Sequence, residues 1–244
     1  MIIHIKTPKT GTTSIDSLAN QNLAKDEIFN ISKDSKEVFD NMTDSEIMKI
    51  KYLTGHYVTK KRIERVKSVI PNTFVFTVFR EPVGWIISNY NYKYRNQEQG
   101  PILSLFLCHS LRRQVSWYLR IICHKPILAF FFKTLDSNKL YQLMFGQLDV
   151  VIPTNYINEA VPRLFFFLGI NPDRNSLPRK NVAGSDVPIK LKRTQLLEQT
   201  LHKKFKKDQE LHDVIISRFV RTFETVLQQA EQSDFLTHAQ FRHE

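Results

Sequence analysis

The run Thr73-Phe74-Val75-Phe76-Thr77-Val78-Phe79 places the strongest constraint on the fold, because every position in it is aromatic or β-branched. A run of this length with no alternation of polar residues is typical of a strand that is covered on both faces, as in a parallel sheet. Arg80-Glu81-Pro82 ends the run, and Pro82 suits the first turn of a helix that continues towards Tyr94. The sequence therefore predicts a buried strand that leads directly into a helix.

Three further segments are predicted to be short strands, and four others carry helical periodicity. The predicted strands are Ile2–Ile5, Tyr52–Thr54 and Leu148–Pro153, and the predicted helices are 12–20, 60–70, a stretch through 164–168, and about 208–230. Strands that alternate with helices favour an α/β fold with a central parallel sheet flanked by helices. A chain of 244 residues without repeats or a low-complexity linker predicts a single domain over 1–244, with a mainly helical region at about 96–147.

A loop of basic and hydroxyl residues follows the first predicted strand. Gly11 lets the backbone turn its N–H groups inward, and the positive end of the next helix adds to the attraction for an anion. Lys9 supplies a full charge, and the hydroxyls that can donate to phosphate oxygens are those of Thr10, Thr12, Thr13 and Ser14. The loop is not a Walker A motif, because its Lys precedes the only Gly by two residues. The alternative is an ordinary Pro-Lys-Thr-Gly turn with a hydroxyl helix cap.

Arg80 stands at the carboxyl end of the predicted strand 73–79, and Ser88 lies about two helical turns further on. Ligands of a parallel sheet bind at the carboxyl ends of its strands, so we expect Lys9 and Arg80 to face one crevice. The planar guanidinium of arginine donates two parallel hydrogen bonds to phosphate. The alternative is that Arg80 pairs with a structural carboxylate.

The two motifs, His4–Ser14 and Phe76–Pro82 with Ser88-Asn89-Tyr90, resemble those of sulfotransferases that use 3′-phosphoadenosine 5′-phosphosulfate (PAPS). The carbohydrate branch, with the heparan sulfate 2-O-sulfotransferases and bacterial relatives, is the more similar one. The resemblance implies a P-loop-like three-layer fold, with PAPS as co-substrate. It implies a 5′-phosphosulfate subsite made of Lys9, Thr10, Gly11, Thr12, Thr13 and Ser14, a 3′-phosphate subsite with Arg80 and Ser88, and a cofactor-covering loop with Arg179 and Lys180.

Two departures from the family pattern stand within these motifs. Thr12 replaces the second Gly that is common in the carbohydrate branch, although Thr is normal there in the cytosolic branch. Val83-Gly84-Trp85 replaces the usual Val-Glu-Arg, so any role of that arginine is absent. Both departures weaken the resemblance to a particular branch of the family, and neither argues against cofactor binding.

Sulfuryl transfer needs a base for the acceptor hydroxyl and a cation for the departing phosphate oxygen. Lys9 suits the second role. Gly55-His56 follows a predicted strand and resembles a Gly-His element whose His is the family's proposed base, so we expect His56 to be the base. The alternative is a His56 that only packs near the crevice. Glu81 is a weaker rival for the base, and His4 in mid-strand is expected to be buried.

The formal charge of +11 favours anionic partners but does not choose among them. Basic residues gather in the last third of the chain, as in a groove for an acidic glycan or in a solvated helix face: Arg179, Lys180, Lys190, Lys192, Arg193, Lys203, Lys204, Lys206 and Lys207. Without metal-ligand spacing we expect no metal, and without a nucleic-acid motif we expect no nucleic-acid partner. The absence of a signal segment or long apolar run predicts a cytoplasmic protein with no membrane span, and a membrane-anchored parent stays open.

The sequence thus favours a sulfotransferase that acts on a hydroxyl, with a carbohydrate as the expected acceptor. Two alternatives stay open at this point. A nucleotide kinase or NTPase with an unusual loop would prefer ATP and depend on magnesium. A non-enzymatic binder of nucleic acid or acidic glycan would bind without Lys9 and Arg80. The sequence leaves the oligomeric state open.

Overall fold

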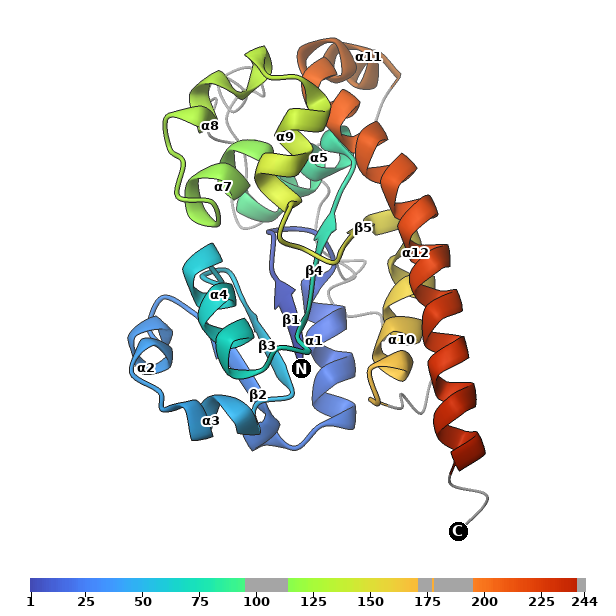
Figure 1. The fold of residues 1–244 in the computed structure, drawn as a ribbon. Coiled ribbons are helices and arrows are strands. Elements are labelled where there is room, and N and C mark those ends of the chain that lie inside the picture. The colour runs from blue at the N-terminus through green and yellow to red at the C-terminus, as the bar shows by residue number, and fades with distance from the viewer. Residues whose placement is uncertain (95–113, 171–176, 178–194, 241–244) are drawn as a thin grey trace.

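The centre of the protein is a five-stranded parallel sheet with the strand order β2-β3-β1-β4-β5 (Figure 1). The computed structural model describes residues 1–94, 114–170, 177 and 195–240. The strands are β1 (Ile2–Ile5), β2 (Ile28–Ile31), β3 (Tyr52–Gly55), β4 (Phe74–Phe79) and β5 (Val150–Pro153). The sheet with helices on both faces confirms the predicted α/β class. The strand β2 was not predicted from the sequence.

Helices and short 3-10 turns connect the strands and cover the sheet. Before β4 they are α1 (Thr12–Asn22), η1 (Lys25–Glu27), α2 (Lys36–Asp40), α3 (Asp44–Lys49) and α4 (Lys60–Val69). Between β4 and β5 they are α5 (Pro82–Lys93), α7 (Gln114–Ile121), α8 (Leu128–Phe131), η2 (Phe132–Thr134) and α9 (Ser137–Phe145). After β5 they are η3 (Thr154–Tyr156), α10 (Ile157–Phe167), α11 (Gln195–Lys204) and α12 (Lys206–Gln240).

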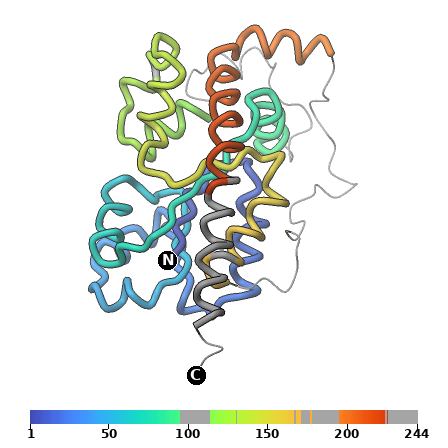
Figure 2. Tube along the Cα trace, turned by 45° about the vertical axis from the view of Figure 1, so that its right-hand side comes forward, coloured from blue at the N-terminus to red at the C-terminus, as the bar shows by residue number. Residues whose placement is uncertain are grey.

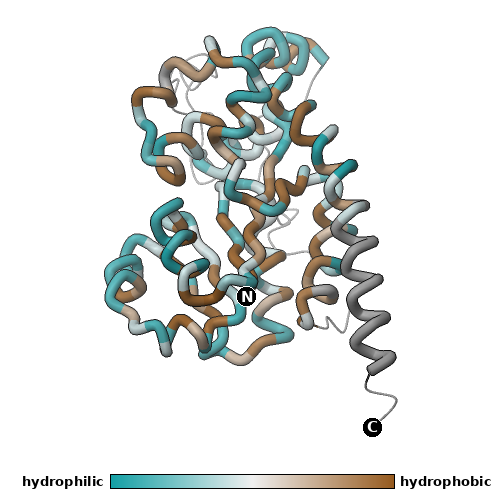
Figure 3. Tube along the Cα trace, in the orientation of Figure 1, coloured by the Kyte–Doolittle hydropathy of each residue, from teal (hydrophilic) through white to brown (hydrophobic). Residues whose placement is uncertain are grey.

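Successive residues of β1 enter different layers, as the pleat of a strand requires. Ile3 and Ile5 pack in a cluster with residues of α2, α3, α4, α7 and α9, whereas Ile2 packs with α1, α10 and Phe219 of α12. Figures 1 and 2 show α1 and α10 on one side of the sheet. Hydrophobic residues concentrate in the central strands (Figure 3). Burial on both faces is why the strand residues are almost all apolar.

The order of the strands places a topological switch point between β1 and β4. The chain leaves β1 towards β2 on one side of the sheet, and it leaves β4 towards β5 on the other side. The connections that follow these two neighbouring strands therefore diverge, which is the arrangement that opens ligand sites in parallel α/β sheets. The carboxyl ends of β1 and β4 point to the group of helices formed by α5, α7, α9 and α11 (Figure 1).

Candidate functional site

The loop after β1 has the backbone shape of an anion-binding turn. Lys9 has a φ of 64° and Gly11 a φ of 78°, both in the left-handed region. Gly11 is the N-cap of α1, and it brings no side chain to that end of the helix. A Cβ at this position would also lie 3.0 Å from Ile157 Cδ1, so the close approach of α10 adds a second reason for glycine. The first turn of α1 contains no acidic residue, so the positive end of its dipole stays available to an anion.

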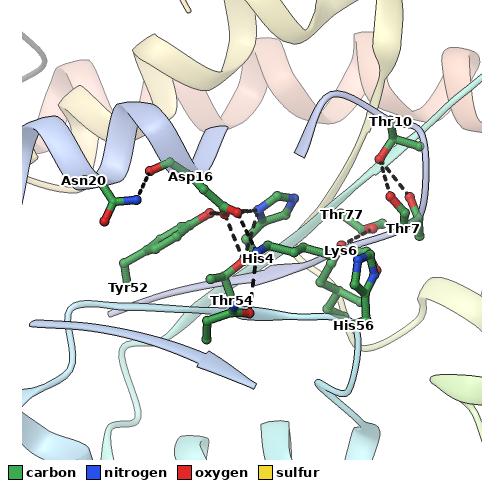
Figure 4. Close-up of polar contacts among 12 residues, drawn as sticks. His4, Lys6, Thr7, Thr10, Asp16, Asn20, Tyr52, Thr54, His56 and Thr77 are labelled. Carbon is green, nitrogen blue, oxygen red and sulfur yellow. Dashed lines mark hydrogen bonds and ion pairs between the residues drawn. The ribbon is translucent and has the colours of Figure 1, made fainter. Parts of the chain in front are cut away.

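The buried hydroxyls of Thr7 and Thr10 fix the conformation of this loop. The Thr7 hydroxyl donates to the Val78 carbonyl at 2.7 Å, which ties the loop to β4. The Thr10 hydroxyl donates to the Thr7 carbonyl at 2.9 Å and lies 3.0 Å from the Thr7 hydroxyl. Figure 4 shows the two threonine side chains turned towards each other. The Thr10 hydroxyl is thus engaged inside the loop, which leaves its backbone N–H as the group that can face a ligand.

Side chains from the end of β4 and the start of α5 donate hydrogen bonds to the same loop. Trp85 Nε1 donates to the Pro8 carbonyl at 2.7 Å, and Arg80 Nη1 donates to the Lys9 carbonyl at 3.3 Å. Gln114 of α7 adds two hydrogen bonds, each 3.3 Å long. Its amide oxygen accepts from the Arg80 backbone N–H, and its amide nitrogen donates to the Thr7 hydroxyl. The structure therefore brings Lys9 and Arg80 together, and Trp85 and Gln114 are site residues that the motifs did not single out.

The departure Val83-Gly84-Trp85 has a local structural reason. Glu81 is the N-cap of α5, and its carboxylate accepts a hydrogen bond from the Gly84 N–H at 2.6 Å. A Cβ on Gly84 would lie 2.2 Å from Glu81 Oε1, so glycine permits this cap. Because its carboxylate is engaged as a cap, Glu81 is less suited to act as a base. Trp85 lies in the same helical turn and contacts the Pro8 carbonyl.

The Lys9 ammonium meets α5 one turn beyond Ser88. The Lys9 ammonium stands over the Tyr92 ring, 4.0 Å from its centroid, which is a cation–π contact. Ser88 is half-buried and lies three residues after Trp85 on α5. Tyr92 is four residues beyond Ser88 and shares its face of α5, so the Lys9 ammonium lies near the helical turn that follows Ser88.

His56 follows Gly55 at the carboxyl end of β3, beside β1. Its Nδ1 lies 3.1 Å from the Lys6 carbonyl, and because a carbonyl only accepts, Nδ1 carries the proton. In the neutral ring this leaves the lone pair on Nε2. His56 is exposed, and partial desolvation of its ring by its neighbours lowers the pKa of His56 below the ordinary value, although the hydrogen bond to the Lys6 carbonyl acts in the opposite direction. The ring packs edge-on against Trp117 of α7, with centroids 5.9 Å apart.

The glycine before His56 is required by the neighbouring strand. Gly55 has a φ of 147°, and a Cβ on it would lie 2.2 Å from the Ile31 carbonyl oxygen at the end of β2. No larger residue fits there without moving one of the two strands. The Gly-His element therefore fixes the point where β3 ends, and with it the position of the His56 ring.

A buried polar network behind His56 centres on Asp16 of α1 (Figure 4). The Asp16 carboxylate lies 2.5 Å from the Lys6 ammonium and accepts hydrogen bonds from the hydroxyls of Tyr52 at 3.1 Å and Thr54 at 3.2 Å. His4 lies in the same network with Nδ1 2.7 Å from the Tyr52 hydroxyl, and it is fully buried, as expected from its place in the strand. The network anchors Lys6, whose carbonyl holds His56.

Some predicted site residues cannot be placed. Arg179 and Lys180 lie outside the described residues, as do residues 96–113 of the helical region at about 96–147. Within the described part of the chain, no cluster of three or more His, Cys, Asp or Glu side chains has an arrangement that could hold a metal ion. Among the helices in that part, none combines the length and the apolarity that a membrane crossing requires.

The fold is similar to that of a solved sulfotransferase from Alicyclobacillus acidocaldarius. The match has a TM-score of 0.50 and 16% sequence identity, and it covers 88% of this chain and 94% of that one. At this identity the likeness shows the fold. No protein-family model and no curated protein matches the sequence.

Proposed function

We propose that the protein is a sulfotransferase that moves a sulfuryl group from PAPS to a hydroxyl, with a carbohydrate as the acceptor. The observation that carries the proposal is that side chains from the end of β4 and the start of α5 hold the loop after β1. Arg80 reaches the Lys9 carbonyl and Trp85 reaches the Pro8 carbonyl, so both motifs meet at one crevice. The similar fold of a known sulfotransferase supports the same reading.

The residues of this crevice fit a doubly phosphorylated nucleotide. The loop backbone, the start of α1 and the Lys9 ammonium would hold the 5′-phosphosulfate, as would the hydroxyls of Thr12, Thr13 and Ser14. Arg80 and Ser88 would hold the 3′-phosphate, and Arg179 and Lys180 would cover the nucleotide. When bound, PAPS supplies an electrophilic sulfur atom and a phosphate as leaving group.

His56 and Lys9 would divide the chemistry between them. His56 Nε2 accepts the proton of the acceptor hydroxyl as the oxygen bonds to sulfur. Lys9 stabilises the negative charge on the phosphate oxygen as its bond to sulfur breaks. The products are the sulfated acceptor and 3′-phosphoadenosine 5′-phosphate, and the imidazolium then loses its proton to solvent.

The charge of the surface supports an acidic or polar acceptor such as a glycan. Lys203, Lys204 and Lys206, at the junction of α11 and α12, are exposed. They belong to the basic residues that the sequence concentrates in this third of the chain. Lysines at such a surface would attract an anionic polysaccharide, and the attraction would weaken with salt.

Thermal unfolding with 3′-phosphoadenosine 5′-phosphate, ADP and ATP tests the proposal. A ligand at a hundred times its Kd adds about 2.7 kcal/mol, which raises Tm by a few degrees for a chain of this size. We expect stabilisation by the 3′-phosphorylated nucleotide alone. Lys9→Ala and Arg80→Ala should each remove the shift, whereas Lys25→Ala, at an exposed site away from the crevice, should retain it.

Other outcomes of this experiment favour the two alternatives. An equal response to ATP that depends on magnesium would point to a nucleotide kinase or NTPase. The absence of any response, together with RNA or glycan binding that survives both substitutions, would point to a non-enzymatic binder.

A further inference from the structure

Tyr92 lies in the last turn of α5, where its ring meets the ammonium group of Lys9. The ammonium nitrogen stands 4.0 Å from the ring centroid, inside the range of about 6 Å in which an aromatic face attracts a cation. Tyr92 is 51% exposed, so its side chain contributes little to the hydrophobic core. The motifs of the sequence assign Lys9 to the site and leave Tyr92 without a role.

The backbone around Lys9 is held in the loop by two side chains. Arg80 Nη1 donates to the Lys9 carbonyl at 3.3 Å, and Trp85 Nε1 donates to the Pro8 carbonyl at 2.7 Å. These contacts do not restrain the Lys9 side chain, whose long stem loses rotamer freedom when its charge is fixed in one place. The Tyr92 ring lies at the charged end of that stem, so it restricts the part of Lys9 that the backbone contacts do not reach.

The contact with the ring is compatible with an anion on the other side of the same ammonium group. An ammonium group has three N–H donors, and an aromatic face attracts it by charge without accepting all three. Donors on the side away from the ring can meet the oxygens of a phosphate. Lys9 can therefore keep its contact with Tyr92 while it binds the nucleotide, so that its charge is in position before the reaction begins.

We propose that Tyr92 is a positioning residue for Lys9, whose ring holds the ammonium where the departing phosphate oxygen gains negative charge. The inference rests on the proposed function, because Lys9 stabilises a leaving group only if the sulfuryl group is transferred. The aromatic face is the group that acts, so phenylalanine should replace Tyr92, whereas an aliphatic side chain should not. The phenolic hydroxyl has no part in this role.

Proton NMR of the Lys9 ε-methylene tests the contact without any reaction. Protons above an aromatic face resonate upfield, and the loss of the signal in Lys9→Ala identifies it. We expect an upfield signal in wild type and Tyr92→Phe and an ordinary position in Tyr92→Leu, both before and after saturation with 3′-phosphoadenosine 5′-phosphate. An ordinary position in wild type without nucleotide would overturn the proposal. A signal that returns to its ordinary position when the nucleotide binds would do so too, because Tyr92 would then withdraw Lys9 from the site.

Release of 3′-phosphoadenosine 5′-phosphate from PAPS, with water as the acceptor and inorganic sulfate as the other product, measures the effect on turnover. Tyr92→Leu should lower kcat about three- to tenfold, as expected for the loss of one cation–π contact, and change KM for PAPS less than about twofold. Tyr92→Phe should keep the wild-type kcat. Phe131→Leu is the matched control, since it removes an aromatic ring that is 62% exposed on α8.

The outcomes separate the role of Tyr92 from the proposed function. A melting curve establishes that each variant is folded. The role is overturned by unchanged kcat in Tyr92→Leu, by equal losses in Tyr92→Phe and Tyr92→Leu, or by tighter binding of 3′-phosphoadenosine 5′-phosphate to Tyr92→Leu. A wild-type protein that binds none of this nucleotide overturns the proposed function itself, and the NMR signal without nucleotide then shows separately whether Lys9 contacts Tyr92.

Discussion

The hydrogen bond between His56 and the Lys6 carbonyl decides which ring nitrogen can act as a base. It fixes the proton on Nδ1, so Nε2 is the nitrogen that can accept another one. The ion pair of Lys6 with Asp16, at 2.5 Å, holds the residue that supplies this carbonyl. The geometry thus prepares a neutral imidazole, and the lowered pKa of His56 keeps it neutral at pH 7.

Replacement of His56 tests this role. Under the proposed function, His56→Ala should lower kcat by about 10²–10⁴-fold and leave the affinity for 3′-phosphoadenosine 5′-phosphate unchanged. Because the folded pKa of His56 is depressed, wild-type kcat/KM should be level near pH 7 and fall only as the pH drops below about 6.5. A pH–rate profile measures this, with the exposed His202→Ala as control. Near-normal turnover of His56→Ala would exclude the assignment.

Residues with a recognisable local motif could be proposed from the sequence, and residues that act through tertiary contacts could not. Lys9, Arg80 and His56 each stand at a strand end with a motif around them. Trp85 and Gln114 have no such signal, because their contacts with the loop span 77 and 107 residues of sequence. The assignment of ligand roles to Ser88, Arg179 and Lys180 stays a prediction.

The first turn of α5 depends on a fit between two residues. The Glu81 carboxylate caps the helix by accepting from the Gly84 N–H, and it occupies the space that a Cβ on residue 84 would need. Loss of a cap typically costs about 0.5–2 kcal/mol. The same turn carries Trp85, whose indole N–H donates to the Pro8 carbonyl, so the cap lies beside the contact between α5 and the loop after β1.

A double-mutant cycle tests this fit. Gly84→Ala should displace the Glu81 carboxylate from its capping position, because the new methyl group needs that space, and the higher helix propensity of Ala offsets part of the loss. Glu81→Ala should remove the cap outright. The double variant should be less destabilised than the sum of the two, since removal of the carboxylate makes room for the methyl group. Urea unfolding of the four proteins gives the coupling, and additive losses would show that the two positions do not compete for space.

Strands and helices with strong patterns were predicted close to their observed bounds, and weak ones were missed. β4 and α5 follow the predictions to within a residue at each end. β2 escaped prediction because it has four residues, of which only Ile31 is fully buried, so its pattern is that of a partly exposed segment. Its pairing with β3 is a tertiary effect, which local propensity does not encode.

Across the whole molecule, α12 joins the layers on the two faces of the sheet. Its Leu211 and Ile215 pack with the cluster of α4, α7 and α9, and Phe219 and Phe223 pack with that of α1 and α10. The helix also buries His212, just as the centre of the sheet buries His4. The two buried imidazoles thus lie in different parts of the fold, His4 in the sheet and His212 in α12.

These two histidines should make global stability depend on pH. Burial lowers the pKa of His4 well below its ordinary value and lowers that of His212, although Asp213 and Glu81 act in the opposite direction on His212. Below about pH 6.5 the unfolded chain binds protons that the folded protein does not. The contribution of these histidines to the free energy of unfolding is therefore fully present above this pH and decreases as the pH drops. The loss is at most about 1.4 kcal/mol per pH unit for each histidine, and it accrues only between the ordinary and the lowered pKa of that histidine.

Urea unfolding at pH 7.5 and 5.5 measures this slope. His212→Leu should make the slope shallower, because residue 212 then has no imidazole to protonate in the unfolded state, while His4 and His56 supply the slope that remains. The exposed His202→Leu should leave the slope unchanged. Carboxylates do not account for the slope, because their ordinary pKa values lie below this range and Arg62 lowers that of Asp40 further. The same slope in wild type and His212→Leu would mean that His212 accepts a proton in the folded protein, which would require α12 to expose it without loss of the fold.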